Sequence, residues 1–193
     1  MTELKVRRIC RELIPDFYTV HSPESGEGWC NCVAWHVPTW DGWDQRSAEQ
    51  NRSLRDELFS RGEFDGYLLY SDGVPVGWCQ AGPRDRLPKL LSSFGLIPEP
   101  GTWAITCMVI IPSSRGKGLC AQFLLLILDE MKTAGIKKIE AYPKQNYGSS
   151  PGEAWLGPLQ AYEKAGFRKM GEVKGNALMV AFPAPPDQKG SQT

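Results

Sequence analysis

The segment between Val109 and Ala121 constrains this chain more than any other. A β-branched run stops at Pro112, and the turn Arg115-Gly116-Lys117-Gly118 then leads directly into an apolar helix. A helix N-terminus leaves its first N–H groups without intrahelical partners and carries partial positive charge, so a turn just before it can surround an anion. The two glycines let the backbone come close to a ligand, and the arginine and lysine add charge. The segment therefore predicts a binding site for a phosphorylated ligand.

Two nucleotide-binding patterns also place glycines beside a helix N-terminus. A Walker loop requires Gly-Lys-Ser/Thr, but here Lys117 is followed by Gly118, and no hydroxyl is placed to hold magnesium. A Rossmann fingerprint requires Gly-x-Gly-x-x-Gly, and Ala121 stands at the last position, which that pattern sometimes tolerates. The fingerprint also needs an acidic residue about 20 residues later, near Glu140. A nucleotide-binding α/β protein is therefore one alternative.

Two motifs in the C-terminal half resemble those of the GNAT superfamily of acyl-CoA-dependent N-acetyltransferases. The stretch Arg115 to Cys120 is similar to the family's Arg/Gln-x-x-Gly-x-Gly/Ala signature, with Cys120 where the family usually has Gly or Ala. The stretch Leu159 to Phe167, which contains Tyr-Glu-Lys-Ala-Gly-Phe, looks like its closing Leu-Tyr-Glu-Lys-x-Gly-Phe motif. The resemblance covers about Tyr67 to Phe182. It implies an α/β GNAT fold, with a mixed six- to seven-stranded sheet, splayed central parallel strands and flanking helices.

The resemblance also implies which residues bind acetyl-CoA, the co-substrate of similar enzymes. Its pantetheine arm would enter the gap between the splayed strands and pair with the backbone of Met108, Val109 and Ile110. Its pyrophosphate would be held by N–H groups of the turn, from Arg115, Gly116, Lys117, Gly118, Leu119 and Cys120. Asn146 would replace an asparagine that the family often carries before its last helix, where this chain has Trp155.

Acetyl transfer needs a deprotonated amine, a polarised thioester carbonyl and a proton for the departing thiolate. The resemblance gives the proton to Tyr162, because a phenol with a pKa of about 10 stays protonated at neutral pH, and the carbonyl to the backbone N–H near Val109. Alternatively, Tyr162 is a packing residue of a short helix. No carboxylate stands between Glu99 and Asp129, where some family members carry a base. The base is then Glu153, Asp41, Asp44, His36 or a chain of water molecules.

Tryptophans and cysteines gather in the region that shapes the acceptor pocket of similar enzymes. The faces of Trp29, Trp35, Trp40 and Trp43 can hold a cationic amine, with help from the nearby aspartates, or can fill a core beneath a long loop. Cys30 and Cys32 lack both the Cys-x-x-Cys spacing and the second ligand pair of a zinc site. We therefore expect no metal.

The hydrophobic pattern predicts one domain over residues 1–182, followed by a disordered tail over 183–193. The first strand and its approach are expected within 5–15 and 29–37, and further strands at 66–70, 74–81, 102–111, 136–142, 167–170 and 177–182. Helices are expected at 45–61, 89–94, 118–134 and 158–166. The apolar residues of the third helix spread beyond one stripe, which indicates burial on more than one side.

The composition limits the classes of partner that this protein can bind. Lys plus Arg and Asp plus Glu both total 22, so no basic field exists to recruit nucleic acid or an anionic membrane. The first residues lack the apolar core of a signal peptide, and no stretch approaches the length of a membrane span. The six cysteines sit mainly in apolar or aromatic company, as reduced thiols do, which favours the cytoplasm. The expected partner is a small-molecule or peptide amine, and a homodimer is left open.

Three hypotheses follow from the sequence. The favoured one is an N-acetyltransferase that moves an acetyl group from acetyl-CoA to a primary amine by direct attack. The second is a catalytically silent acyl-CoA-binding module, which keeps the turn but lacks the base. The third is the nucleotide-binding α/β protein.

Overall fold

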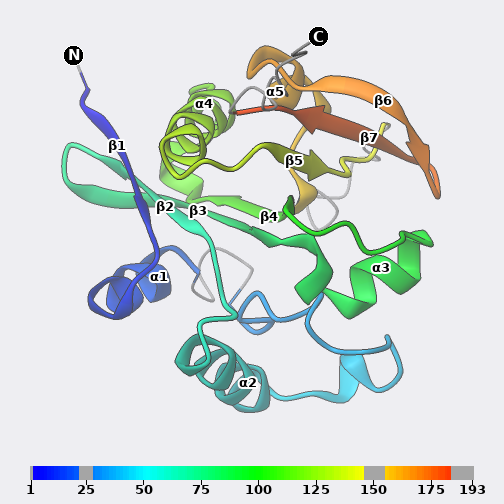
Figure 1. Ribbon diagram of the computed structural model, residues 1–193. Coiled ribbons are helices and arrows are strands. Elements are labelled where there is room, and N and C mark those ends of the chain that lie inside the picture. The colour runs from blue at the N-terminus through cyan, green and yellow to red at the C-terminus, as the bar shows by residue number, and fades with distance from the viewer. Residues whose placement is uncertain (1, 22–27, 146–154, 184–193) are drawn as a thin grey trace, which may run out of the picture.

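The computed structural model describes residues 2–21, 28–145 and 155–183 (Figure 1). The described strands form one seven-stranded sheet in the order β1-β2-β3-β4-β5-β7-β6. They are β1 (Leu4–Arg8), β2 (Tyr67–Ser71), β3 (Val74–Pro83), β4 (Thr102–Ile110), β5 (Lys138–Ala141), β6 (Arg168–Val173) and β7 (Asn176–Ala181). Neighbouring strands are antiparallel except β4 and β5, which are parallel. The predicted mixed sheet is confirmed.

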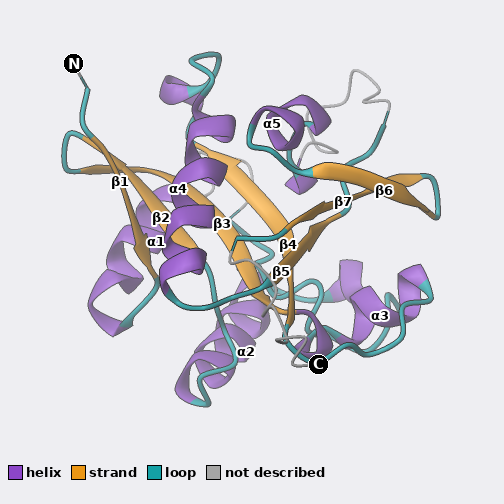
Figure 2. Ribbon diagram, turned by 45° about the horizontal axis from the view of Figure 1, so that its top comes forward, coloured by secondary structure: helices purple, strands orange, loops and turns teal. Residues whose placement is uncertain are grey.

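Helices cover both faces of this sheet. They are α1 (Ile14–Val20), α2 (Ala48–Ser60), α3 (Pro88–Phe94), α4 (Leu119–Thr133) and α5 (Leu159–Lys164). In Figure 1, α4 and α5 lie on one side of the sheet and α1, α2 and α3 on the other. Figure 2 shows α4 over the β1 to β4 part of the sheet and α5 beside β6 and β7. The two halves of the sheet therefore carry different helices on the α4 side, and they meet at β4 and β5.

The strands β4 and β5 diverge because β4 contains a bulge. Their pairing runs from Thr102 opposite Lys138 to Ile105 opposite Ala141. On the other side of β4, Cys107 pairs with Gln80 and Ile105 with Ala81, so Thr106 is the extra residue. A bulge bends its strand and re-aims the side chains that follow. Beyond Ile105, β4 pairs with β3 alone, which confirms the splayed central strands.

The helix α4 is buried beyond a single stripe. Phe123, Leu124, Ile127 and Met131 are buried, and Leu126 and Leu128 on either side of them are partly buried against the same core. The helix packs against β1 and β4 of the sheet and against α5, as burial on more than one side requires, whereas Leu125 is 47% exposed. None of the described helices combines the length and apolar character needed to cross a membrane.

The N-terminal part differs most from the sequence-based expectation. The strand β1 ends at Arg8, and the chain soon enters α1, whose Phe17 and Val20 are buried under the sheet. Residues 29–37 form a series of turns instead of a strand, with positive φ at Asn31 and Cys32. Their apolar residues are buried against the sheet from these turns, so the apolar pattern required no strand. The predicted tail lies almost wholly outside the described residues.

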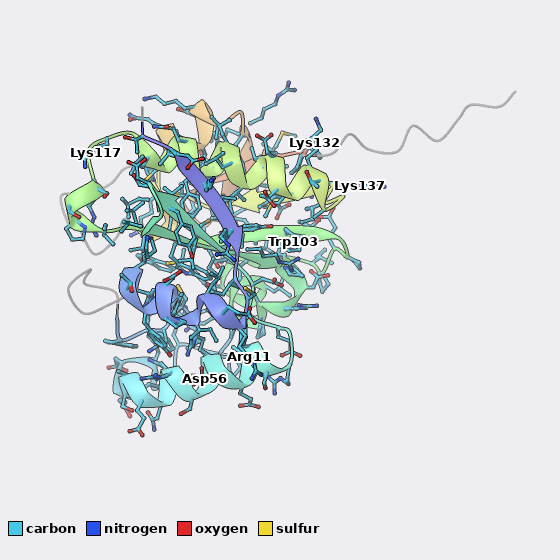
Figure 3. The ribbon with its side chains drawn as sticks, turned by 90° about the vertical axis from the view of Figure 1, so that its left-hand side faces the viewer. Arg11, Asp56, Trp103, Lys117, Lys132 and Lys137 are labelled. Carbon is cyan, nitrogen blue, oxygen red and sulfur yellow. The ribbon has the colours of Figure 1, made fainter. Side chains whose placement is uncertain are left out.

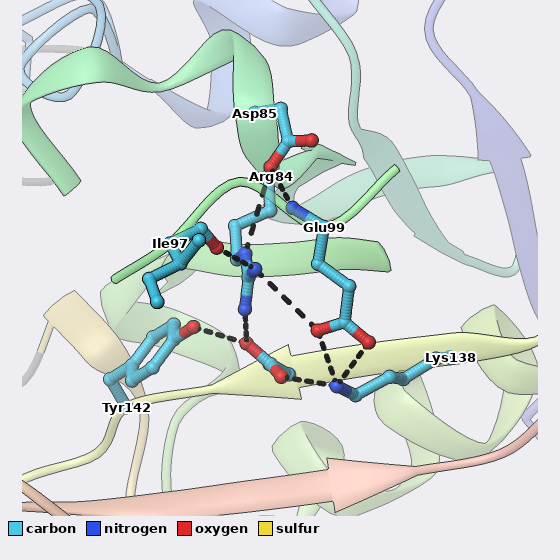
Figure 4. Close-up of polar contacts among 7 residues, drawn as sticks. Arg84, Asp85, Ile97, Glu99, Lys138 and Tyr142 are labelled. Carbon is cyan, nitrogen blue, oxygen red and sulfur yellow. Dashed lines mark hydrogen bonds and ion pairs between the residues drawn. The ribbon is translucent and has the colours of Figure 1, made fainter. Parts of the chain in front are cut away.

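A buried ion pair holds the connection after β3 against β5 (Figure 4). The Arg84 Nη1 lies 2.6 Å from Oε2 of Glu140, and each side chain is 4% exposed. The guanidinium also donates to the Ile97 carbonyl at 2.7 Å, and the Lys138 ammonium lies 2.9 Å from the second oxygen of Glu140. The Tyr142 hydroxyl donates to Oε2 of Glu140 as well. Glu140 is thus held in a structural pair, and the role it had in the Rossmann alternative is wrong.

Candidate active site

The turn predicted to bind a phosphorylated ligand connects β4 to α4. Gly116 and Gly118 both take left-handed backbone conformations, with φ of 76° and 72°, and Gly118 caps the N-terminus of α4. A Cβ at either position would meet no atom within 4 Å. Glycine is therefore needed here for the backbone conformation, and the space beside it is open to a ligand. Arg115 Nε donates to the Ile110 carbonyl at 2.7 Å, which ties the turn to the end of β4.

A pocket of about 230 Å³ opens beside this turn. It is lined by Ile110, Ser114, Arg115, Gly116, Gly118, Leu119, Cys120, Ala121, Pro158, Gln160, Ala161 and Lys164. The structure thus brings together most of the residues that the sequence assigned to the cofactor. Met108, Val109 and Lys117 are not among the lining residues.

The helix α5 supplies a wall of this pocket that sequence reasoning missed. Gln160, Ala161 and Lys164 lie on one face of the helix, and Lys164 brings a positive charge to the pocket. Their helical spacing is readable in the sequence. Which face of α5 turns toward the glycines depends on how α5 packs against α4, and no local pattern shows that.

Lys117→Ala is expected to change the dissociation constant of acetyl-CoA by less than about 3-fold, because an exposed lysine in water contributes little to binding. Figure 3 shows Lys117 and Lys132 at opposite ends of α4. The Lys117 ammonium donates to the Ser113 carbonyl at 3.1 Å on the exposed side of the turn. Isothermal titration calorimetry checks the prediction, and a loss of more than about 10-fold, or 1.4 kcal/mol, would show that the side chain itself binds the ligand.

Tyr162 is buried beside the splayed part of β4. Its side chain is 0% exposed, and its hydroxyl donates to the Leu156 carbonyl at 2.7 Å. A Cβ built on Gly157 would lie 3.1 Å from the Tyr162 hydroxyl oxygen and 3.5 Å from the Met108 sulfur. The hydroxyl and the Met108 sulfur therefore both lie next to Gly157, although they come from α5 and β4. The bulge at Thr106 contributes to this arrangement, because it sets the face of β4 on which Met108 lies.

The gap between β4 and β5 leaves backbone groups of β4 unpaired with β5. The Thr106 carbonyl accepts a hydrogen bond from the Trp35 indole at 3.3 Å. The Met108 side chain packs in the core under α4, and the Val109 side chain packs in the core under α1. An extended ligand that contains amides can therefore bind this part of β4 only through the main chain.

A model of the acetyltransferase (GNAT) family matches residues 29–167. The chain belongs to the GNAT family. Membership makes it an acyltransferase with acetyl-CoA as co-substrate, which the open turn, the pocket and the splayed strands fit. It also rules out the nucleotide-binding alternative. A search of curated proteins found no significant match.

Solved structures share this GNAT fold at low sequence identity. The aminoglycoside acetyltransferase AAC(6')-Ib, in complex with coenzyme A and kanamycin, superposes with a TM-score of 0.55 at 19% identity, covering 93% of this chain and 95% of that one. The ribosomal-protein-S18-alanine N-acetyltransferase from Escherichia coli gives 0.54 at 11% identity, covering 97% and 99%. An N-acetyltransferase from Staphylococcus aureus Mu50 gives 0.54 at 14% identity, covering 94% and 99%.

The α3 side of the GNAT sheet carries a row of indole rings beside the gap. Trp35 is 4% exposed, and its ring centroid lies 5.5 Å from that of Trp40 and 5.5 Å from that of Trp155. The Lys89 ammonium, from α3, lies 3.0 Å from the Trp40 ring centroid and 4.8 Å from that of Trp43. Trp35 belongs to the core, as one interpretation of the tryptophans expected. Two of the other rings contact the protein's own lysine, and their role in holding the amine of an acceptor stays a prediction.

Among the proposed bases, His36 is connected to β4 through hydrogen bonds. Its Nε2 lies 3.3 Å from the side-chain nitrogen of Gln80, whose oxygen accepts from the Thr106 hydroxyl at 2.9 Å. Burial lowers the pKa of His36 to about 4, against an opposing effect of Glu63, so the imidazole is neutral at pH 7.

No contact among the described residues places the other proposed bases, or Asn146, at the gap between β4 and β5. Asp41 and Asp44 are exposed in the turn that carries Trp40. Glu153 and Asn146 lie outside the described residues.

Cys30 and Cys32 lie in a buried cluster on the α1 side. Cys30 Sγ is 3.6 Å from His21 Nε2, and Cys32 Sγ accepts from the Trp78 indole at 3.1 Å. A hydrogen bond with Cys32 and burial raise the pKa of the Cys30 thiol far above its usual value. Within the described ranges, no three His, Cys, Asp or Glu side chains are grouped to hold a metal, and the six cysteines form no disulfide. The cluster fills space beneath the sheet.

Proposed function

We propose that this protein transfers the acetyl group of acetyl-CoA to a primary amine of a small molecule or a peptide, by direct attack of the amine on the thioester. The observation that carries the proposal is the buried Tyr162 hydroxyl, fixed on the Leu156 carbonyl beside Met108, where β4 leaves β5. The glycine turn lies at the C-terminal end of β4, and the indole row lies on the α3 side of the gap. A thioester in the gap and an amine on the indole side would meet near Tyr162.

In this proposal the turn and the gap divide the binding of acetyl-CoA. Backbone N–H groups from Arg115 to Cys120 hold the pyrophosphate at the start of α4, with positive charge from Arg115 and Lys164. The main chain from Met108 to Ile110 pairs with the pantetheine arm. The relatives crystallised with coenzyme A support this assignment at the level of the shared fold.

The chemistry needs a donor for the leaving group. The amine nitrogen forms a bond to the acetyl carbon as the carbon–sulfur bond breaks, and the Tyr162 hydroxyl gives its proton to the departing thiolate. The backbone N–H near Val109 polarises the carbonyl. The proton lost by the amine passes to solvent, and solvent returns a proton to Tyr162.

The test is a thiol-release assay with acetyl-CoA across a panel of primary amines, for the wild type and Tyr162→Phe. We expect kcat to fall about 100-fold in the variant, the lower end of what a positioned acid contributes. The dissociation constant of acetyl-CoA should stay within about 3-fold, since the hydroxyl adds little to ground-state binding.

A matched control is Tyr70→Phe. Tyr70 is also buried and donates its hydroxyl to Asp16 at 2.6 Å, but it lies on β2, away from the gap. This control should keep its kcat while losing a similar hydrogen bond. Equal kcat in Tyr162→Phe and wild type would exclude the acid role. Tight acetyl-CoA binding without thiol release on any amine would favour the silent module, in line with the absence of a carboxylate from β4.

A further inference from the structure

Among the described residues, Lys89 is a buried cation without an ionic partner. Its side chain is 0% exposed, and within the described residues its Nζ has no hydrogen-bond partner. The other deeply buried cations differ: Arg84 pairs with Glu140, and Arg55 pairs with Asp56 and contacts the Tyr18 hydroxyl. Buried charges in proteins are normally paired. An unpaired one with three unused donors is therefore a place where an anion would bind.

The lysine keeps its charge in this setting. Burial lowers the pKa of its ammonium to about 8, so most molecules carry the positive charge at neutral pH. The rings of Trp40 and Trp43 attract the cation through their faces but accept no ordinary hydrogen bond. Trp40 is itself 45% exposed, so it covers the ammonium from a position near solvent.

The lysine stands at one end of the indole row, and the gap stands at the other. From Lys89, the row passes over Trp40 to Trp35, whose indole donates to the Thr106 carbonyl at the bulge of β4. A series of aromatic contacts therefore connects the cation to the point where β4 leaves β5. A molecule that replaces the exposed Trp40 ring in this series would have one end at Lys89 and the other toward the thioester.

We propose that Lys89 binds a carboxylate of the acceptor, so that the acceptors of this enzyme are amines with an apolar or aromatic body and a carboxylate. This inference rests on the proposed function. The carboxylate displaces the exposed Trp40 ring from the ammonium and accepts hydrogen bonds from it. The apolar body takes the place of that ring against Trp35, and the amine reaches the gap. A buried positive charge at this place also disfavours polycationic acceptors such as aminoglycosides.

The test compares 4-(2-aminoethyl)benzoate with 2-phenylethylamine, which share the ring and the amine and differ by a carboxylate at the opposite end of the ring from the amine. For the wild type we expect kcat/KM to favour 4-(2-aminoethyl)benzoate by about 10- to 100-fold, the range of one charge-assisted hydrogen bond. In Lys89→Met this preference should shrink to within about 3-fold, and in Lys89→Arg part of it should return. Lys132→Met, at the exposed end of α4, is the matched control and should keep the wild-type preference.

A binding measurement separates this inference from the reaction. The probe is 3-phenylpropionate, which has the ring and the carboxylate but no amine. Calorimetry should show binding to the wild type that weakens at least about 10-fold in Lys89→Met but not in Lys132→Met. Acetylation of both amines without a preference, together with equal binding of 3-phenylpropionate to wild type and Lys89→Met, overturns the inference and leaves the proposed function standing. Lysine-dependent binding of the probe without acetylation of any amine overturns the proposed function alone.

Discussion

Gly118→Val is expected to abolish the binding of acetyl-CoA, with a loss beyond about 100-fold, or 2.7 kcal/mol. Gly118 has a φ of 72° at the N-cap of α4, and it lines the pocket. A β-branched residue is strained by about 1 to 3 kcal/mol in this conformation, and its side chain would occupy the open space where a phosphate must approach the N–H groups. Titration calorimetry with acetyl-CoA measures the effect.

Gly135→Val is the matched control for this experiment. Gly135 follows the other end of α4, has the same φ of 72°, and a Cβ there would also meet no atom within 4 Å. Both variants should lose similar thermal stability, because the backbone strain is the same. Only Gly118→Val should lose binding. Retained affinity in a folded Gly118→Val protein, or an equal loss in both variants, would contradict the assignment of the turn to the pyrophosphate.

Glu140→Gln is expected to lower the free energy of unfolding by about 3 to 5 kcal/mol, the usual effect of removing one partner of a buried ion pair. The substitution keeps the shape of the side chain but leaves the Arg84 guanidinium, whose side chain is 4% exposed, without its buried counter-charge. Urea denaturation at neutral pH measures the loss. Glu99→Gln is the control, because Glu99 contacts the same Arg84 and Lys138 with a side chain that is 49% exposed. We expect a change below about 1 kcal/mol for it.

The pH dependence provides a second check on this pair. Burial alone would raise the pKa of Glu140, but the Tyr142 hydroxyl, the Lys138 ammonium and the Arg84 guanidinium outweigh it and lower the pKa below its ordinary 4.5. A carboxylate with a lowered pKa stabilises the fold fully above its unfolded pKa, and the contribution is lost as the pH falls through the folded one. The stability difference between wild type and Glu140→Gln should therefore be largest at neutral pH and narrow below about pH 4.5. A difference that does not narrow would show that the charge of Glu140 is not what stabilises the fold.

Local sequence was sufficient where a structure depends on near neighbours. The left-handed turn at Gly116 and Gly118, the helix that follows it and the hairpin of β2 and β3 are set by residues a few positions apart, and the structure contains them. The two family motifs gave the GNAT fold for the same reason. The pattern was misleading at residues 29–37, where apolar side chains are buried from turns, and at Leu125 of α4, which is 47% exposed although it is apolar.

The sequence by itself determined the family, the acetyl-CoA co-substrate and the place of the glycine turn, because these follow from backbone conformations that short motifs encode. Only the tertiary structure decided which side chains meet. The bulge at Thr106, the approach of Tyr162 and Met108 to Gly157 and the position of Lys89 under Trp40 each join segments distant in the chain. Such contacts arise from packing across the sheet and between helices, and burial then changes the charge and hydrogen bonding of the groups involved. For that reason the residues on the acceptor side of the site could be identified only from the tertiary structure.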